Sequence, residues 1–233
     1  RLGGVSHPPY DSLNLGDHVQ DDPQLVAQNR NLLRQQLNGA RPVFLKQVHG
    51  TDVLNLDPST PDGATADACF TQKPQVACTI MVADCLPILF TDSKGTTVAA
   101  AHAGWRGLAR GVIENTVKTL CLESGAEPSE LMVWLGPCIG PNAFEVGCDV
   151  RQEFLEADKT ADRCFKHHPH NPHKYMADLP ALARERLRSL GVLLTAGNDS
   201  SDAWCTVHQA SQFFSYRRDG VTGRFAACIW RNA

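Results

Sequence analysis

Hydrophobic positions recur along the chain at two spacings, about 3.6 residues and about two residues, and together they predict helices interleaved with strands. Helical spacing is clearest over residues 23–37, where Asp22 is the candidate N-cap, and over residues 108–124. Two further amphipathic helices are predicted over 149–158 and 179–192. The β-rich runs predicted as strands are 42–50, 75–82, 86–92, 96–103 and 130–135.

Segments rich in Gly, Pro and polar residues separate these elements. Residues 1–22 predict irregular structure, residues 56–67 a loop, and the polar stretch 165–175 a solvated loop. Residues 213–231 predict a β-hairpin, because Asp-Gly and Thr-Gly pairs separate two β-rich flanks. The interleaving of strands, hairpins and helices indicates an α+β fold of mixed sheets with packed helices, in one domain over residues 1–233.

Composition narrows the class of protein. With 233 residues, of which 42% are hydrophobic and 20% charged, the chain has enough apolar material for one large domain. No apolar run is long enough to cross a membrane and no charged-then-apolar leader opens the chain, which favours a cytoplasmic location. The net charge of −3 and scattered basic residues argue against a nucleic-acid partner. The nine cysteines include no CxxC pair, so most are expected to be reduced.

Residues 82–107 set a cysteine and a histidine at the outer ends of a predicted hairpin. If the turn centres on Ser93-Lys94, Asp92 faces Gly95 and Cys85 faces His102. Directly opposed residues share one face of a sheet, with Cβ atoms about 4.5 to 5.5 Å apart. We therefore expect Cys85 and His102 to converge, either on a zinc ion or as a nucleophile and its base. A bulge or an odd loop would break this register.

A catalytic zinc ion usually has three protein ligands, so a third is needed. The best candidate is His49 in "KQVHG", at the end of a β-rich run beside a glycine. The remaining histidines lack such a setting. They are a cluster in the predicted solvated loop (His167, His168, His170 and His173) and three isolated residues (His7, His18 and His208).

The motifs carry a family resemblance. "KQVHG", "ADCLPILF", "AAAHAGWRG", "WLGPCIGPNAFEVG" and "FFSYRRDGVTGR" follow one another in this order, after "RLGGVS" and "SLNLGDH" near the start. Together they resemble the YfiH-type family, long labelled multicopper polyphenol oxidase or laccase-like and now grouped with purine nucleoside phosphorylases. The resemblance implies an α+β fold related to cytotoxic necrotizing factor-type cysteine hydrolases. It also implies a zinc ion held by His49, Cys85 and His102.

The resemblance further implies phosphorolysis of purine nucleosides (inosine, guanosine, adenosine or methylthioadenosine) and adenosine deamination. Hydroxide generated at zinc suits deamination, because zinc lowers the pKa of bound water to about 7. Phosphorolysis needs residues that bind phosphate. Arg106 and Arg217 are the main candidates, and Arg1 and Arg30 are weaker ones. Asp84 is expected to orient a metal ligand or to shuttle a proton. Gln47 shares a strand face with His49 and has an equally plausible structural role.

Copper is the alternative metal. A His₂Cys set can hold copper, yet laccase chemistry needs a coupled cluster with many histidines in close pairs, which this sequence lacks. We therefore expect zinc, with copper as an alternative occupant.

Two other functions compete with the phosphorylase. One is a metal-free cysteine hydrolase, with Cys85 as nucleophile and His102 as base, that edits peptidoglycan precursors. The other is a non-catalytic metal- or nucleotide-binding protein. The expected partners are purine nucleosides and phosphate, with no membrane, and the expected assembly is a monomer or weak homo-oligomer.

Overall fold

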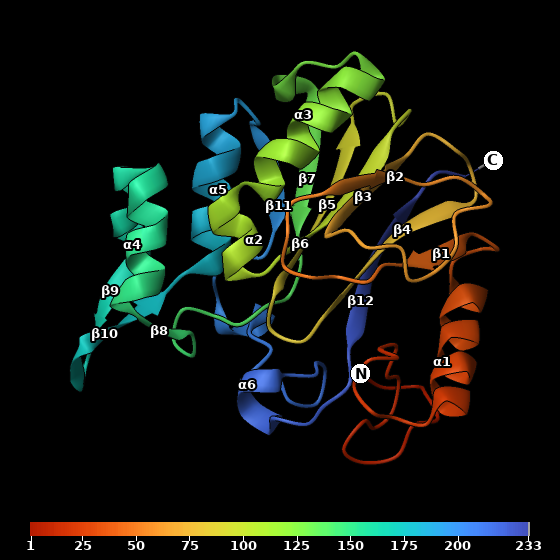
Figure 1. Ribbon diagram of the computed structural model, residues 1–233, viewed down its shortest axis with the longest axis horizontal. Helices are drawn as coiled ribbons and strands as arrows, with labels where there is room; N and C mark the ends of the chain where they lie inside the picture. The colour runs from red at the N-terminus through yellow and green to blue at the C-terminus, as the bar shows by residue number, and fades with distance from the viewer. Residues whose placement is uncertain (233) are drawn as a thin grey trace.

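The computed structural model describes residues 1–232, and its central element is a six-stranded mixed sheet (Figure 1). In spatial order its strands are β11 (Leu194–Gly197), β7 (Leu131–Leu135), β5 (Leu86–Asp92), β6 (Val98–Ala103), β3 (Ala68–Thr71) and β2 (Val53–Asn55). The predicted hairpin of β5 and β6 lies at the centre, and the antiparallel strands β7 and β3 flank it. The outermost pairs, β7 with β11 and β3 with β2, are parallel.

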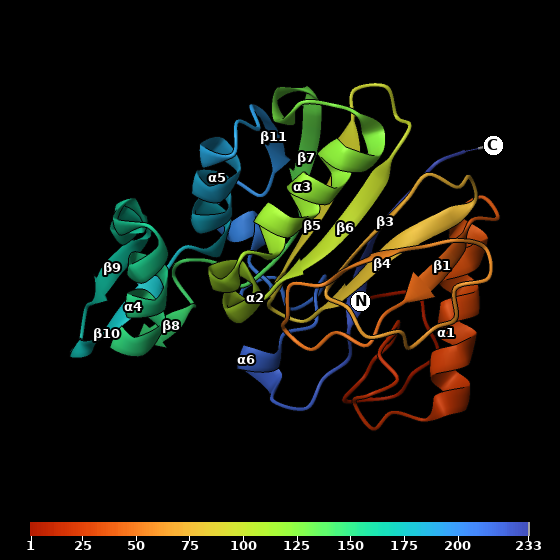
Figure 2. The same cartoon turned by 45° about the horizontal axis from the view of Figure 1, so that its top comes forward.

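Helices cover one face of this sheet (Figure 2). They are α2 (Trp105–Arg110), α3 (Val112–Ser124) and α5 (Leu179–Ser189). Their apolar faces pack on alternate residues of β5 and β6, such as Ile88, Phe90 and Ala101, all fully buried. The helix predicted over 108–124 is interrupted at Gly111, whose φ of 99° ends α2 in the left-handed region that favours glycine.

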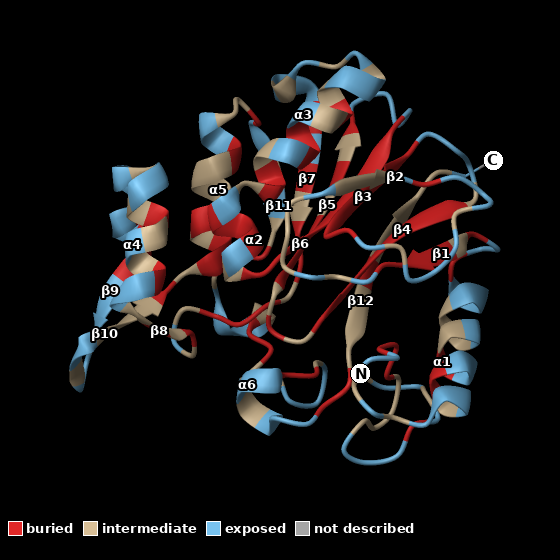
Figure 3. Ribbon diagram, in the orientation of Figure 1, coloured by how far each residue is buried: buried red, intermediate tan, exposed pale blue. Residues whose placement is uncertain are grey.

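A second, three-stranded sheet packs on the other face. Its order is β1 (Arg41–Phe44), β4 (Val76–Val82) and β12 (Phe225–Trp230). All seven residues of β4 are buried, as the uninterrupted apolar run predicts, so the strand interiors form the buried centre of the molecule (Figure 3). The outer side of this sheet packs on α1 (Pro23–Gln36), which is the predicted helix and is capped as expected, with the Asp22 carboxylate accepting from Gln24 N at 2.8 Å.

A small third sheet lies at one edge of the molecule, beside α4 (Cys148–Ala157) (Figure 1). Its order is β8 (Glu145–Gly147), β10 (Asn171–Ala177) and β9 (Phe165–His168). The remaining elements are α6 (Tyr216–Asp219) and the 3₁₀ helices Pro128–Glu130, Lys159–Cys164 and Asp202–Trp204. Together the layers form a single α+β domain, as predicted. None of the helices described is long and apolar enough to cross a membrane.

The predicted register of the central hairpin is wrong by two residues. Asp92 pairs with Thr97, not with Gly95, because the Asp92 carboxylate accepts a hydrogen bond from Thr97 N at 2.6 Å and closes a four-residue loop. As a result His102 lies opposite Pro87 rather than Cys85. A displacement of two residues keeps every side chain on its predicted face, so Cys85, two positions before Pro87, still lies on the His102 side of the sheet.

Two predicted segments fold differently. The polar stretch 165–175 is not a solvated loop but the β9–β10 ribbon, in which the His167 ring packs against Tyr175. Residues 213–231 are not a hairpin. The Ser215 side chain caps α6 by accepting from Arg218 N, and β12 pairs with β4 instead. The turn of the β9–β10 hairpin, Pro169-His170, is not one of the usual two-residue turn pairs, and β12 pairs with the distant strand β4, so propensity revealed neither outcome.

Candidate metal centre and its cavity

The structure brings His49, Cys85 and His102 together at one end of the packed sheets. Their ligand atoms all lie within 4.8 Å of one another, with the Cys85 Sγ 3.7 Å from the His49 Nε2 and the two imidazole centroids 4.8 Å apart. Each residue comes from a different element: His102 from β6, Cys85 from the residue before β5, and His49 from the loop after β1. Within residues 1–232 this is the single cluster of three or more His, Cys, Asp or Glu side chains able to hold a metal ion.

A buried carboxylate, Asp67, organises two of these ligands. Its side chain is fully buried, and its oxygens accept hydrogen bonds from the His102 Nδ1 at 2.8 Å and from the backbone N–H groups of His49, Val48 and Gly50 at 2.8, 3.0 and 2.7 Å. These bonds hold His49 at a φ of 61°, in the left-handed region. Because the Nδ1–H of His102 donates to Asp67, the Nε2 lone pair of the neutral ring is left for a metal.

Electrostatics favour a thiolate at Cys85. Burial alone would raise the pKa of Cys85, but the charge on His102 and hydrogen bonds from His102 and His49 outweigh it and lower that pKa to about 6. Burial also opposes protonation of His102, yet the Cys85 charge and the hydrogen bond to Asp67 raise its pKa to about 9. Without a metal, the pair is thus a thiolate and an imidazolium at neutral pH. A thiolate is what both a metal centre and a cysteine nucleophile require.

Gly104 leaves the space that the cluster fills. A Cβ atom at this position would lie 2.7 Å from the His49 Cδ2 and 3.0 Å from the Cys85 Sγ, both shorter than van der Waals contact. The glycine at the entrance to α2 is therefore needed for close approach rather than for an unusual φ.

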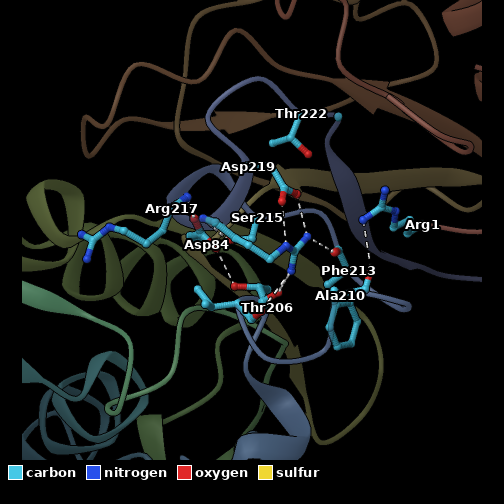
Figure 4. Close-up of polar contacts among 12 residues, drawn as sticks. Arg1, Asp84, Thr206, Ala210, Phe213, Ser215, Arg217, Asp219 and Thr222 are labelled. Carbon is cyan, nitrogen blue, oxygen red and sulfur yellow. Dashed lines mark hydrogen bonds and ion pairs between the residues drawn. The ribbon is translucent and has the colours of Figure 1, made fainter. Parts of the chain in front are cut away.

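One of the two sequence hypotheses for Asp84 was that it orients a metal ligand, but its carboxylate has other hydrogen-bond partners. Its carboxylate accepts from the Thr206 Oγ1 and from Arg217 N, each at 2.6 Å, and Figure 4 shows it turned toward these residues. These bonds anchor a non-glycine residue at a φ of 96°, directly before Cys85. Asp67 has the ligand-orienting role instead. Its only sequence signal is an aspartate at the end of a loop, directly before a buried strand.

The metal cluster opens into a cavity of about 500 Å³. Two of the sequence candidates, Arg106 and Gln47, line it. The Arg106 guanidinium lies over the Trp105 ring, 4.4 Å from its centroid. Both ends of the Gln47 amide bond the Met81 backbone, at 2.8 and 2.9 Å, which favours the structural interpretation of this residue. His18 and Arg224 also line the cavity, and sequence reasoning missed both.

Arg217 lies beside the cluster in an adjoining, mainly apolar cavity of about 160 Å³. Its guanidinium donates to the carbonyl oxygens of Ala143 and Glu145, both at 3.2 Å. The two cavities share Cys85 and Trp105, so Cys85 lies between an apolar compartment and a basic one, whereas His49 and His102 line the basic one alone.

The two weaker arginine candidates line neither cavity. Arg1 bonds the Asp11 carboxylate and the Ala210 carbonyl, and Arg30 bonds the Leu15 carbonyl.

Comparison with known proteins gives the family. The family model described as multi-copper polyphenol oxidoreductase laccase matches residues 1–232. A Pseudomonas aeruginosa protein named purine nucleoside phosphorylase is 52% identical over 99% of this chain and 90% of its own length. The purine nucleoside phosphorylase YfiH of Escherichia coli is 49% identical over 99% of this chain and 90% of its own length.

Solved structures agree with the computed fold. A Neisseria meningitidis protein, NMB0706, superimposes with a TM-score of 0.91 at 45% identity, covering 99% of this chain and 91% of that one. YlmD from Geobacillus stearothermophilus gives a TM-score of 0.86 at 31% identity, covering 99% and 89%. The chain therefore belongs to the laccase-like polyphenol oxidoreductase family, the YfiH-type family that its sequence motifs resemble.

Proposed function

We propose that this chain is a zinc-dependent purine nucleoside phosphorylase with adenosine deaminase activity. The observation that carries the proposal is a three-ligand cluster at the floor of a cavity large enough for a nucleoside, in a chain 52% identical to a protein named purine nucleoside phosphorylase. The proposed substrates are inosine, guanosine, adenosine and methylthioadenosine, together with phosphate.

The donor set suits zinc. One thiolate and two imidazoles are typical zinc ligands, and the hydrogen bond from the His102 Nδ1–H to Asp67 fixes the tautomer that leaves the His102 Nε2 unprotonated. A zinc ion held by these three residues would supply a Lewis acid that can lower the pKa of bound water to about 7. Copper is an alternative occupant of the same ligands.

The residues around the cluster form two compartments that suit the two substrates. Trp105 and Phe144 line the apolar compartment, where a purine ring can stack, and Arg106 lines the basic compartment, where phosphate can bind. In phosphorolysis a phosphate oxygen bonds to the ribose C1′ while the bond from C1′ to N9 breaks, and the purine leaves with a proton on nitrogen. In deamination water adds at C6 of the purine and ammonia leaves.

The pair of Cys85 and His102 favours a second candidate function. A thiol whose pKa is lowered to about 6 beside a protonated imidazole is the arrangement of a cysteine nucleophile and its base. A metal-free cysteine hydrolase acting on an amide, such as a peptidoglycan precursor, would use it directly. The kinship with cytotoxic necrotizing factor-type cysteine hydrolases belongs to this alternative.

The other functions have less support. Laccase chemistry needs a coupled copper cluster, whereas the part of the chain that the structure describes offers one group of three ligands. A purely binding protein with closed zinc would need a fourth ligand, and that group contains none. A cytoplasmic location and a monomeric or weakly oligomeric state stay predictions.

A product assay tests the proposal. Purified protein, loaded with zinc, is incubated with inosine and phosphate, and hypoxanthine and ribose 1-phosphate are measured before and after chelation. We expect both products, and their loss on chelation and in the variant Cys85→Ser. Cys148→Ser, at an exposed cysteine, is the matched control and keeps activity. Full turnover after chelation would contradict the zinc mechanism, and amide hydrolysis by the chelated protein would favour the cysteine hydrolase.

A further inference from the structure

The side chain of Arg224, which is among the residues lining the main cavity, has an unused hydrogen-bonding edge. Its Nη1 donates to the carbonyl oxygens of Thr222 and Gly223, at 3.0 and 3.1 Å, which fixes the plane of the guanidinium. Among residues 1–232 no protein acceptor bonds its Nε or its Nη2, the two atoms that form the parallel fork matching two oxygens of a phosphate. Arg224 lines the same cavity as Cys85 and His102.

His18 lies on the same basic side of the cavity. It lines the main cavity together with Arg224, and it lines the two smaller cavities that adjoin it. Partial burial, followed by the positive charge of Arg224, lowers the pKa of His18, while the Asp17 carboxylate, 3.5 Å from the His18 Nδ1, opposes that shift. With Nδ1 beside Asp17, Nε2 is the ring nitrogen that can donate to a phosphate oxygen.

The N-terminal motif "SLNLGDH" holds the backbone of Arg224 in place. The Asn14 Oδ1 accepts from Arg224 N at 2.8 Å and from Gly16 N at 2.9 Å, while Leu15 N donates to the Arg224 carbonyl at 3.0 Å. A Cβ atom on Gly16 would lie 2.8 Å from the Arg224 Cγ, so only glycine fits there. The motif therefore has a structural role that is separate from the metal centre. Its residues pack around Arg224, and its last residue is His18.

We propose that Arg224 and His18 form the subsite for the phosphate co-substrate, on the opposite side of Cys85 from the apolar compartment. The inference rests on the proposed phosphorylase function and assigns a residue pair to one of its two substrates. Arg224 grips two phosphate oxygens through Nε and Nη2, and His18 donates to a third. The purine base then occupies the apolar compartment beside Trp105, and the ribose C1′ lies between the two. Arg217 lies in the apolar compartment, where its Nη1 and Nη2 each donate to a backbone carbonyl, so we assign it no part in this subsite.

The test separates phosphate binding from turnover. The variants are Arg224→Gln, Arg224→Lys and His18→Gln, with Arg188→Gln as the matched control because it removes an exposed arginine on α5 outside both cavities. Binding of inorganic phosphate to the zinc-loaded proteins is measured by calorimetry, and the KM values for phosphate and for inosine are measured separately. Thermal unfolding reports whether each variant folds. His18→Gln and Arg224→Lys preserve the test if Arg224→Gln fails to fold.

We expect the affinity for phosphate to fall and the KM for phosphate to rise by about tenfold or more in both Arg224 variants, and severalfold in His18→Gln, because charge-assisted hydrogen bonds are lost. The KM for inosine and the control should stay near the wild-type values. Wild-type phosphate binding in folded Arg224→Lys and His18→Gln would overturn the subsite. If the wild-type protein binds phosphate through these residues but does not phosphorolyse inosine, the subsite stands and the proposed reaction falls.

Discussion

Replacing Asp67 with asparagine tests how the metal centre is held together. The Asp67 carboxylate accepts four hydrogen bonds, one from His102 and three from the backbone N–H groups of residues 48–50, at 2.7 to 3.0 Å. An asparagine has one acceptor oxygen, and its NH₂ group would face two of the four donors. Two buried donors left unpaired cost about 1–3 kcal/mol each. We therefore expect Asp67→Asn to lower the free energy of unfolding by about 2–6 kcal/mol, a large part of the about 5–15 kcal/mol typical of a domain.

The same substitution should weaken metal binding in the molecules that remain folded. Loss of the carboxylate that orients a ligating histidine typically costs about 10- to 100-fold in metal affinity. Zinc affinity is measured by competition with a chromophoric chelator at a temperature where circular dichroism shows the variant folded. Asp52→Asn, which removes the same charge from an exposed position nearby, is the control. If Asp67→Asn bound zinc as tightly as the wild type, the carboxylate would not organise this centre.

Three further predictions follow from the site. In the metal-free protein, alkylation of Cys85 by iodoacetamide should be half-maximal near pH 6, since the thiolate is lost only as the pH falls through this lowered pKa. Bound zinc should protect Cys85 from alkylation. Gly104→Ala should leave the protein folded but reduce zinc affinity at least about tenfold, because the added methyl group displaces the His49 ring. Equilibrium dialysis measures the zinc affinity, and an unchanged value would refute the packing argument. Asp84→Asn should lower stability by about 1–3 kcal/mol in chemical unfolding, since one of two 2.6 Å hydrogen bonds loses its acceptor, with bound zinc retained.

The sequence predicted the parts of the fold that depend on local pattern. The helix after Asp22 and the buried strand β4 follow directly from apolar spacing. The strand β11 was missed because it is a short parallel strand with mostly exposed side chains, and its position depends on pairing with β7. The histidine-rich segment 165–175 was mistaken for a loop for a different reason. Its two strands form a local hairpin whose Pro169-His170 turn lacks the usual glycine signal, and β10 also pairs with the more distant β8.

The metal ligands could be anticipated for a reason that does not require the exact register. A hairpin displaced by an even number of residues keeps every side chain on its original face, so Cys85 and His102 converge although they are not directly opposed. Had the loop been one residue longer or shorter, the two would lie on opposite faces. The loop length is set by the Asp92 carboxylate, which accepts from Thr96 and Thr97, and this capping was not evident in the sequence.

Asp67 and Arg224 were missed because their roles arise from segments distant in sequence. Asp67 reaches residues 48–50 and His102, and Arg224 is held by Asn14, 210 positions away. In both cases most of the bonds go to backbone groups, three N–H groups for Asp67 and two carbonyl oxygens for Arg224, so charge pairing along the chain could not signal these roles, although Asp67 also pairs with His102. The two differ in one respect that bears on function. Every acceptor site of Asp67 is satisfied inside the protein, which marks it as a positioning group, whereas Arg224 lines the cavity with its bidentate edge unpaired. A partly buried arginine held by backbone carbonyls on one side and unpaired on the other is arranged to bind an anion from outside the chain.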